Sequence, residues 1–192
     1  MLPEIIFFSL ISLIILFIRK KKFDITSIKI EIKGYQILII AAVIEITAEF
    51  LYKNYNNNNL LKILSLHWLI YFAIFIVTLL NFKKPFMKLL FIGTLFNFIA
   101  IVSNDFKMPV LVSDVLANAE AKKLYLQTGQ DLIHSLLLED TKFKILCDII
   151  TLAPPYPFPK TISIGDVFLL LGVFAVWHEK SEEKEVTCSP NP

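Results

Sequence analysis

Two glutamates lie inside a long apolar stretch of the chain, and their spacing makes them candidates for chemistry. Glu45 and Glu49 are four residues apart, which puts both carboxyl groups on one face of a helix, about 6 Å apart along its axis. Carboxylates this close repel each other unless one of them carries a proton. The pair indicates proton relay, cation binding or general acid catalysis, and the sequence does not choose among these roles.

Polar residues in three other apolar stretches fall at a similar predicted depth. An ionisable group inside a bilayer costs at least about 2.5 kcal/mol, so such residues are functional hypotheses. The candidate intramembrane cluster consists of Glu45, Glu49, His67, Asn97 and Asp166. The structural alternative is that Asn97 is an interhelical hydrogen-bond donor and that Asp166, three residues after Ser163, caps the last helix. Glu45 fits this alternative least well, because it needs a partner or a proton.

A second set of polar residues follows the fourth apolar stretch. The candidate outer-loop residues are Asn104, Asp105, Lys107, Met108, Pro109, His134, Asp140, Thr141 and Asp148. A histidine oriented by a carboxylate can act as a general base, so His134 or His67 with Asp140 or Asp148 would suit a hydrolase. The chain contains no H-E-x-x-H motif and no Walker loop. No catalytic residue is identified, and a non-enzymatic role is favoured.

These motif residues resemble those of a family of small bacterial multi-pass membrane proteins that is known only as a domain of unknown function. Asn97 followed by the stretch N-D-F-K-M-P-V at 104–110 is similar to that family's asparagine followed by N-G-G-R-M-P-V. His134, Asp140-Thr141, Asp148 and the S-I-G-D stretch at 163–166 match further elements in the same order. The resemblance covers residues 90–175 and implies a membrane fold with an extracytoplasmic motif loop, without a known reaction.

The chain departs from that family pattern at three places. Asp105 and Phe106 replace two glycines, which argues against a left-handed turn there that every member of the family requires. Lys107 replaces an arginine, so a point charge takes the place of a planar fork for phosphate or carboxylate. Cys147 stands where the family has glycine.

The composition shows which elements must position these residues. Of 192 residues, 56% are hydrophobic and 19% are charged, and the mean hydropathy is +0.65. Soluble domains are roughly 45–50% apolar and about 25% charged. We therefore predict an all-α membrane protein with a bundle of about five transmembrane helices. The predicted spans are residues 2–18, 35–52, 63–80, 86–103 and 163–177.

The distribution of lysine and arginine predicts the orientation of these spans. With the N-terminus outside, eleven of the 19 Lys and Arg residues lie at the cytoplasmic face, whereas the short outer loop carries only Lys53 and Lys62. The positive-inside bias therefore predicts a plasma-membrane protein with its N-terminus outside and its C-terminus inside. Basic residues follow the first apolar stretch rather than precede it, so this stretch is an uncleaved span and not a signal peptide.

Residues 1–178 are predicted to form one transmembrane domain, with an outer loop at 104–162 between spans four and five. Within this loop, helices are expected at 113–129, 130–138 and 142–150, lying on the outer membrane face or forming a lid. The prolines at 154–159 predict an extended approach to the last span. Residues 179–192 are expected to be a disordered cytoplasmic tail. Cys147 outside and Cys188 inside cannot pair, and both are predicted to be free.

Three classes of function are consistent with this organisation. An accessory or structural membrane subunit is favoured. A small transporter or lipid-handling protein using Glu45 as a proton or cation site is the alternative, and it predicts a homo-oligomer or a larger membrane complex because five spans enclose little volume. A hydrolase at the outer face is the third. The lipid bilayer is an expected partner; no metal or cofactor is predicted, and the net charge of +2 gives no case for nucleic acid.

Overall fold

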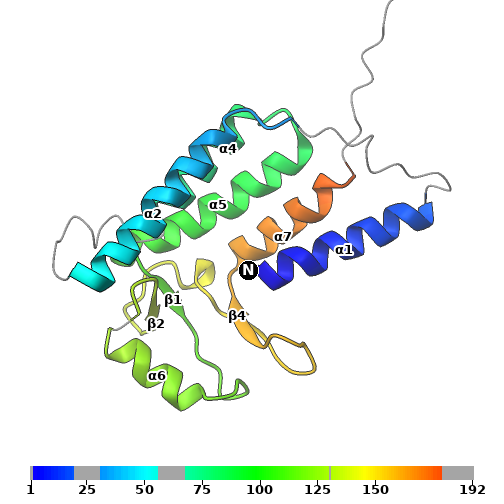
Figure 1. Ribbon diagram of the computed structural model, residues 1–192. Helices are drawn as coiled ribbons and strands as arrows, with labels where there is room; N and C mark the ends of the chain where they lie inside the picture. Colours follow the sequence, from blue (N-terminus) through cyan, green and yellow to red (C-terminus); the bar gives the residue numbers. More distant parts are fainter. Residues whose placement is uncertain (1, 20–30, 56–67, 130, 179–192) are drawn as a thin grey trace, which may run out of the picture.

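The computed structural model describes residues 2–19, 31–55, 68–129 and 131–178. In this part the chain is mostly helical (Figure 1). The α-helices are α1 (Leu2–Arg19), α2 (Tyr35–Tyr55), α4 (Trp68–Leu80), α5 (Pro85–Ser103), α6 (Ala119–Gln127) and α7 (Ile164–Val176). The remaining elements are the strands β1 (Met108–Val110), β2 (His134–Leu136), β3 (Ile150–Leu152) and β4 (Lys160–Ile162) and the 3-10 turn η2 (Lys144–Leu146).

Five apolar helices coincide with the five predicted spans. Of these, α2 and α5 are long and apolar enough to cross a membrane, whereas α1, α4 and α7 are shorter apolar helices. The start of the third predicted span, at 63–67, lies outside the described residues, as do His67, Cys188 and the predicted tail at 179–192. Length and composition alone therefore favour membrane association.

The five apolar helices form a single row in the order α1, α7, α5, α4, α2 (Figure 1). At the centre of the row α5 contacts α7, and two glycines of α7 lie directly against side chains of α5. A Cβ atom on Gly165 would lie 2.0 Å from Asn97 Oδ1, and one on Gly172 would lie 2.6 Å from Leu90 Cδ2. Glycine is therefore required at this crossing, as is common where membrane helices approach closely.

Contacts between the helices also give their directions. Asn97 near the end of α5 meets Asp166 at the start of α7, and Leu90 near the start of α5 meets Gly172 late in α7, so these two helices are antiparallel. The pair α2 and α4 is antiparallel as well, because the backbone N–H of Lys33, before α2, donates to Asn81 Oδ1, after α4 (2.9 Å).

Helix α4 is antiparallel to α5, and α1 is parallel to α7. Tyr71 near the start of α4 lies by the end of α5, while Phe82, after α4, packs on Phe91 in the first half of α5 (5.3 Å between ring centroids). In α1, Ser12 Oγ donates to the carbonyl oxygen of Phe174 in α7 (2.7 Å). The five helices therefore alternate in direction along the sequence.

The segment between α5 and α7 is a small mixed unit of helix and strand, so the prediction of three loop helices is wrong. Only α6 is helical in the predicted 113–129 region; residues 134–136 form a strand, and 142–150 contains one 3-10 turn followed by the start of β3. Strand β1 pairs in parallel with β2, and β3 pairs antiparallel with β4.

The backbone of β1 explains this difference. All three residues of β1 are buried, so their N–H and C=O groups need partners from neighbouring chain segments. Residues 134–136 supply them on one side, and Asp148 forms a parallel bridge to Val110. The apolar residues at 132–137 have helical spacing, but a run this short does not distinguish a strand from a helix.

The turn between α5 and β1 also differs from the prediction. Asp105 has φ 55° and Phe106 has φ 59°, so the chain adopts left-handed backbone at both positions although neither is glycine. Only four residues separate α5 from β1, and the side chain of Asn104 fixes the turn by donating from Nδ2 to Ala100 O and to Lys142 O (2.7 and 3.0 Å). Asp105 and Phe106 therefore carry backbone strain in this turn.

Candidate functional site

The mixed unit between α5 and α7, residues 104–162, is called the outer-loop unit after its predicted position. A pocket of about 500 Å³ lies where this unit meets α4, α5 and α7. It brings together members of both predicted sets: Met108, His134 and Asp148 come from the loop, and Asp166 comes from the intramembrane set. The full lining consists of Tyr71, Ile101, Met108, Val110, Lys122, Ile133, His134, Asp148, Lys160, Thr161 and Asp166.

Asp148 is the most unusual group in this pocket. Its backbone is fixed against β1, because its N–H donates to Pro109 O (3.0 Å) and its carbonyl oxygen accepts from Leu111 N (2.8 Å). The side chain is only 7% exposed, and Oδ1 has no hydrogen-bond partner among the described residues. Burial and the nearby Asp166 raise the pKa of Asp148 to about 8 from an ordinary value of 3.8. Asp148 therefore carries a proton at neutral pH.

Asp166, by contrast, is fully engaged at the start of α7. Its Oδ1 accepts from Asn97 Nδ2 (2.8 Å), and its Oδ2 accepts from the N–H of Ser163 (3.4 Å). Ser163 Oγ accepts from the N–H of Asp166 (2.9 Å) and donates to Asn97 Oδ1 (2.7 Å). The predicted capping role of Asp166 and the predicted interhelical role of Asn97 are both present, so this network holds α5 against α7.

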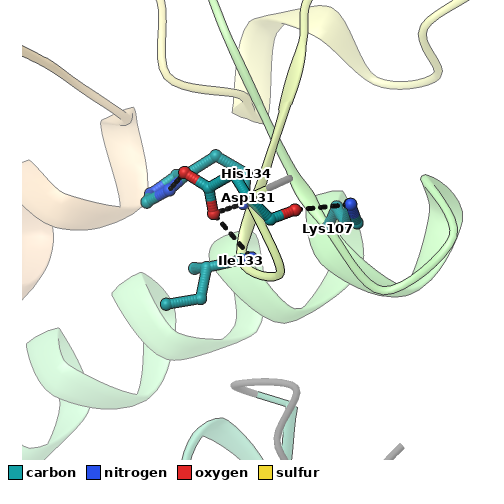
Figure 2. Close-up of polar contacts among 4 residues, drawn as sticks. All are labelled: Lys107, Asp131, Ile133 and His134. Atoms are coloured by element: carbon teal, nitrogen blue, oxygen red, sulfur yellow. Dashed lines mark hydrogen bonds and ion pairs between the residues drawn. The ribbon is translucent and has the colours of Figure 1, made fainter. Parts of the chain in front are cut away.

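His134 is oriented by Asp131, as Figure 2 shows. Asp131 Oδ2 lies 3.2 Å from His134 Nδ1, while Oδ1 accepts from the backbone N–H groups of Ile133 and His134 (2.8 and 2.9 Å). Burial opposes ionisation of Asp131, but these hydrogen bonds outweigh it and hold its pKa well below the usual range. An ionised Asp131 places the proton on His134 Nδ1, so Nε2 is left for a ligand.

Lys107 stabilises this arrangement instead of binding a ligand. Its Nζ donates to the backbone carbonyl oxygen of Asp131 (Figure 2). The sequence proposed Asp140 or Asp148 as the residue that orients the histidine, and it missed Asp131. The Asp-x-x-His spacing of 131 and 134 is the signal that identifies this pair, because a carboxylate three residues before a histidine can reach its ring in a turn.

Two lysines line the pocket in different states. Lys160 Nζ pairs with Glu4 Oε2 at the start of α1 (2.7 Å), and Tyr156 donates to Glu4 Oε1 (3.2 Å). Burial lowers the pKa of Lys160, but the bond to Glu4 outweighs this effect and raises it. Lys122 on α6 makes no ion pair within the described ranges, whereas the next residue, Lys123, pairs with Asp114 (2.7 Å).

Several predicted residues lie away from the pocket. Glu45 is buried and Glu49 is half-buried on α2, but neither contributes to the lining. Asp105 and Asp140 are exposed, and Thr141 Oγ1 accepts from Leu138 N (2.8 Å) within the loop. The part of the chain that the structure describes contains no group of three or more His, Cys, Asp or Glu side chains arranged to hold a metal ion.

Cys147 is a buried, free cysteine next to Asp148. Its thiol lies 3.5 Å from the carbonyl oxygen of Phe143. Burial and the charge of Asp148 raise the pKa of the Cys147 thiol to about 11. It is therefore a packing residue, because a thiol rather than a thiolate is present at neutral pH.

Comparison with known proteins gives one match. The model of a family of unknown function, DUF5317, matches residues 29–177. This range contains α2, α4, α5, the whole outer-loop unit and α7, and hence every residue of the pocket lining. No curated protein and no solved structure matches the chain.

Proposed function

The chain belongs to DUF5317, a family without a known reaction, and we propose that it is a multi-pass plasma-membrane protein. In this proposal it binds a small ligand in the pocket at its outer face. The buried Oδ1 atom of Asp148 is the observation that carries this proposal.

The alternating directions of the helices support five membrane crossings. A chain that crosses five times must reverse direction at each crossing, and α1, α2, α4, α5 and α7 do so. The outward side of α2 also exposes large apolar residues, such as Ile40, Ile46 and Phe50, which suit contact with lipid. Together with the positive-inside bias, this arrangement supports a topology with the N-terminus and the outer-loop unit outside and the C-terminus inside.

The pocket supports ligand binding. Its volume falls within the roughly 300–1,000 Å³ of ordinary small-molecule sites, and it combines apolar walls with a few polar groups. Leaving a buried polar atom without a hydrogen bond costs about 1–3 kcal/mol, and a bound ligand would remove that cost at Asp148. Asp148 is one of the residues that line the pocket, so a ligand bound there lies next to its carboxyl group.

This role refines the accessory subunit that the sequence favours. A protein that binds a ligand at the outer leaflet can serve a larger membrane complex, so a homo-oligomer or a complex is also part of the proposal. Transport through Glu45 has less support, because Glu45 lies outside the pocket lining.

A pocket-filling substitution tests ligand binding. Ile133→Trp places an indole into the pocket from its half-buried rim, whereas Leu124→Trp on the exposed side of α6 is the matched control. We expect native mass spectrometry of the purified full chain to detect a bound small molecule in the wild type and in the control, and not in Ile133→Trp. Equal occupancy in all three proteins, with unchanged thermal stability, would contradict the proposal.

The Asp131–His134 pair favours hydrolysis as a second candidate function. In that case His134 Nε2 takes a proton from water, the water oxygen attacks an ester, and Asp148 gives its proton to the leaving alkoxide. Hydrolysis of a water-soluble ester by the purified protein should then fall at least about 100-fold in His134→Ala. A rate in the wild type equal to that of His134→Ala would exclude this candidate.

A further inference from the structure

We infer that the ligand of this pocket carries a phosphate group, held by Lys122, His134 and Asp148. This inference rests on the proposed binding function. Some polar groups that line the pocket already have hydrogen-bond or ion-pair partners, and the others determine which ligand the pocket selects.

Most of the polar groups in the pocket are already engaged. Asp166 accepts hydrogen bonds at both carboxylate oxygens, and Lys160 is paired with Glu4. Thr161 Oγ1 donates to Leu111 O (2.9 Å), and the Nδ1 atom of His134 faces Asp131. These groups give the pocket its shape and charge, but they leave little capacity for a ligand.

The groups that remain are mostly hydrogen-bond donors. Lys122 Nζ forms no ion pair with any described residue, and an ammonium group can only donate. Asp148 is protonated at neutral pH, so its free capacity includes an O–H donor in a buried position. His134 presents Nε2, because its Nδ1 faces Asp131. The donors of Lys122 and Asp148 line the same pocket and select a ligand that is rich in acceptor oxygens.

A cation would be recognised less well by these groups. Both carboxylate oxygens of Asp166 already accept hydrogen bonds, and Asp148 would have to lose its proton first. Among the described residues, the charged groups near Asp148 are Asp166, Lys122 and Lys160. Two of these side chains are positive and one is negative, which favours an anion over a cation. A phosphate oxygen satisfies the Asp148 proton and the Lys122 charge together.

A phosphate group occurs both on lipid headgroups and free in solution, and the pocket offers the chemistry that recognises either. The pocket lies at the ends of α5 and α7 next to the outer-loop unit, which is the headgroup layer in the proposed topology. Apolar side chains, including Ile101, Met108 and Val110, form the rest of its lining and suit the glycerol or acyl part of a lipid.

Titration of the full-length protein in a phosphate-free, lipid-free maltoside micelle tests the inference. The two probes are inorganic phosphate and dihexanoylphosphatidylglycerol below its micellar concentration, and choline chloride is the cationic control. Lys122→Gln should weaken binding of the phosphate probe about 10-fold, while Lys123→Gln, a change one residue away in a surface ion pair, should change it less than about twofold. Asp148→Asn keeps a donor and should retain most of the affinity, whereas Asp148→Leu should lose it.

Binding of both probes would indicate recognition of the phosphate itself, and binding of the lipid alone would indicate a headgroup site; either supports the inference. Phosphate binding that is unaffected by Lys122→Gln and Asp148→Leu, or equally weakened by Lys123→Gln, overturns it. Choline binding that depends on Asp148, without phosphate binding, overturns the inference but leaves the ligand-binding function intact. If the wild type binds no ligand at all, and Ile133→Trp behaves in the same way, both the phosphate inference and the ligand-binding function are wrong.

Discussion

Replacement of Asp148 by asparagine is expected to remove a pH dependence from the stability of the protein. The pKa of this carboxyl group is about 8 in the folded chain and 3.8 in its ordinary state. The folded state thus binds the proton more tightly than the unfolded state does. The stability that this proton confers is complete below pH 3.8 and is lost as the pH rises through 8.

The size of the effect follows from this difference. Each pH unit between the two pKa values changes the free energy of unfolding by about 1.4 kcal/mol, so the full window of about four units corresponds to about 6 kcal/mol. An asparagine in the same place has no proton to lose. Its stability should therefore fall less steeply than that of the wild type between pH 4 and pH 8.

The assay is chemical unfolding of the full chain in maltoside micelles at pH 5, 6, 7 and 8. The quantity of interest is the difference in free energy of unfolding between Asp148→Asn and the wild type, because the contributions of all groups that the two proteins share cancel in it. Asp114→Asn is the control, since the Asp114 side chain is 83% exposed. Parallel curves for the wild type and Asp148→Asn across this range would refute the reasoning.

Three further predictions concern the backbone, the helix contact and the topology. Phe106→Gly should be more stable than Phe106→Ala by about 1 kcal/mol in thermal unfolding, because φ is 59° there and only glycine adopts that conformation without strain; equal stabilities would argue against a strained turn. Gly165→Ala should lose several kcal/mol of stability, because the added Cβ would clash with the side-chain amide oxygen of Asn97. The control Gly129→Ala, with φ 70° and open space around it, should lose only about 1–2 kcal/mol. Similar losses in the two variants would show that α5 and α7 can separate without penalty. In whole cells, a membrane-impermeant maleimide should label Asp114→Cys and spare Lys83→Cys until the membrane is permeabilised, and the reverse pattern would invert the proposed orientation.

Hydropathy predicted the positions of the apolar helices well, because a stretch of about 20 apolar residues has few alternatives to a helix. Helix α5 at Pro85–Ser103 differs by one residue from the predicted 86–103, and α7 begins directly after Ser163 as the capping pattern predicts. The capping box at Ser163 and Asp166 could be found because it depends only on residues three apart.

The outer-loop unit could not be predicted in the same way. Its strands are three residues long, and the pairings of β1 join segments more than twenty residues apart, such as Met108 and His134. Local periodicity contains no information about such pairings. The same limit explains why the sequence did not indicate Asp131: the polar residues that share a pocket are selected by the loop's tertiary pairing and not by membrane depth alone.

The parallel contact between α1 and α7 has a consequence for biosynthesis. Helix α1 docks against α7 through Ser12 with Phe174, a contact that spans 162 residues of sequence, and against β4 through Glu4 with Lys160. Until α7 has been translated, α1 lacks these contacts for a buried hydroxyl and a buried carboxylate. Helix α1 therefore joins the row only after α7 has been made, and a chain that stops before α7 leaves Ser12 without the carbonyl oxygen to which it donates.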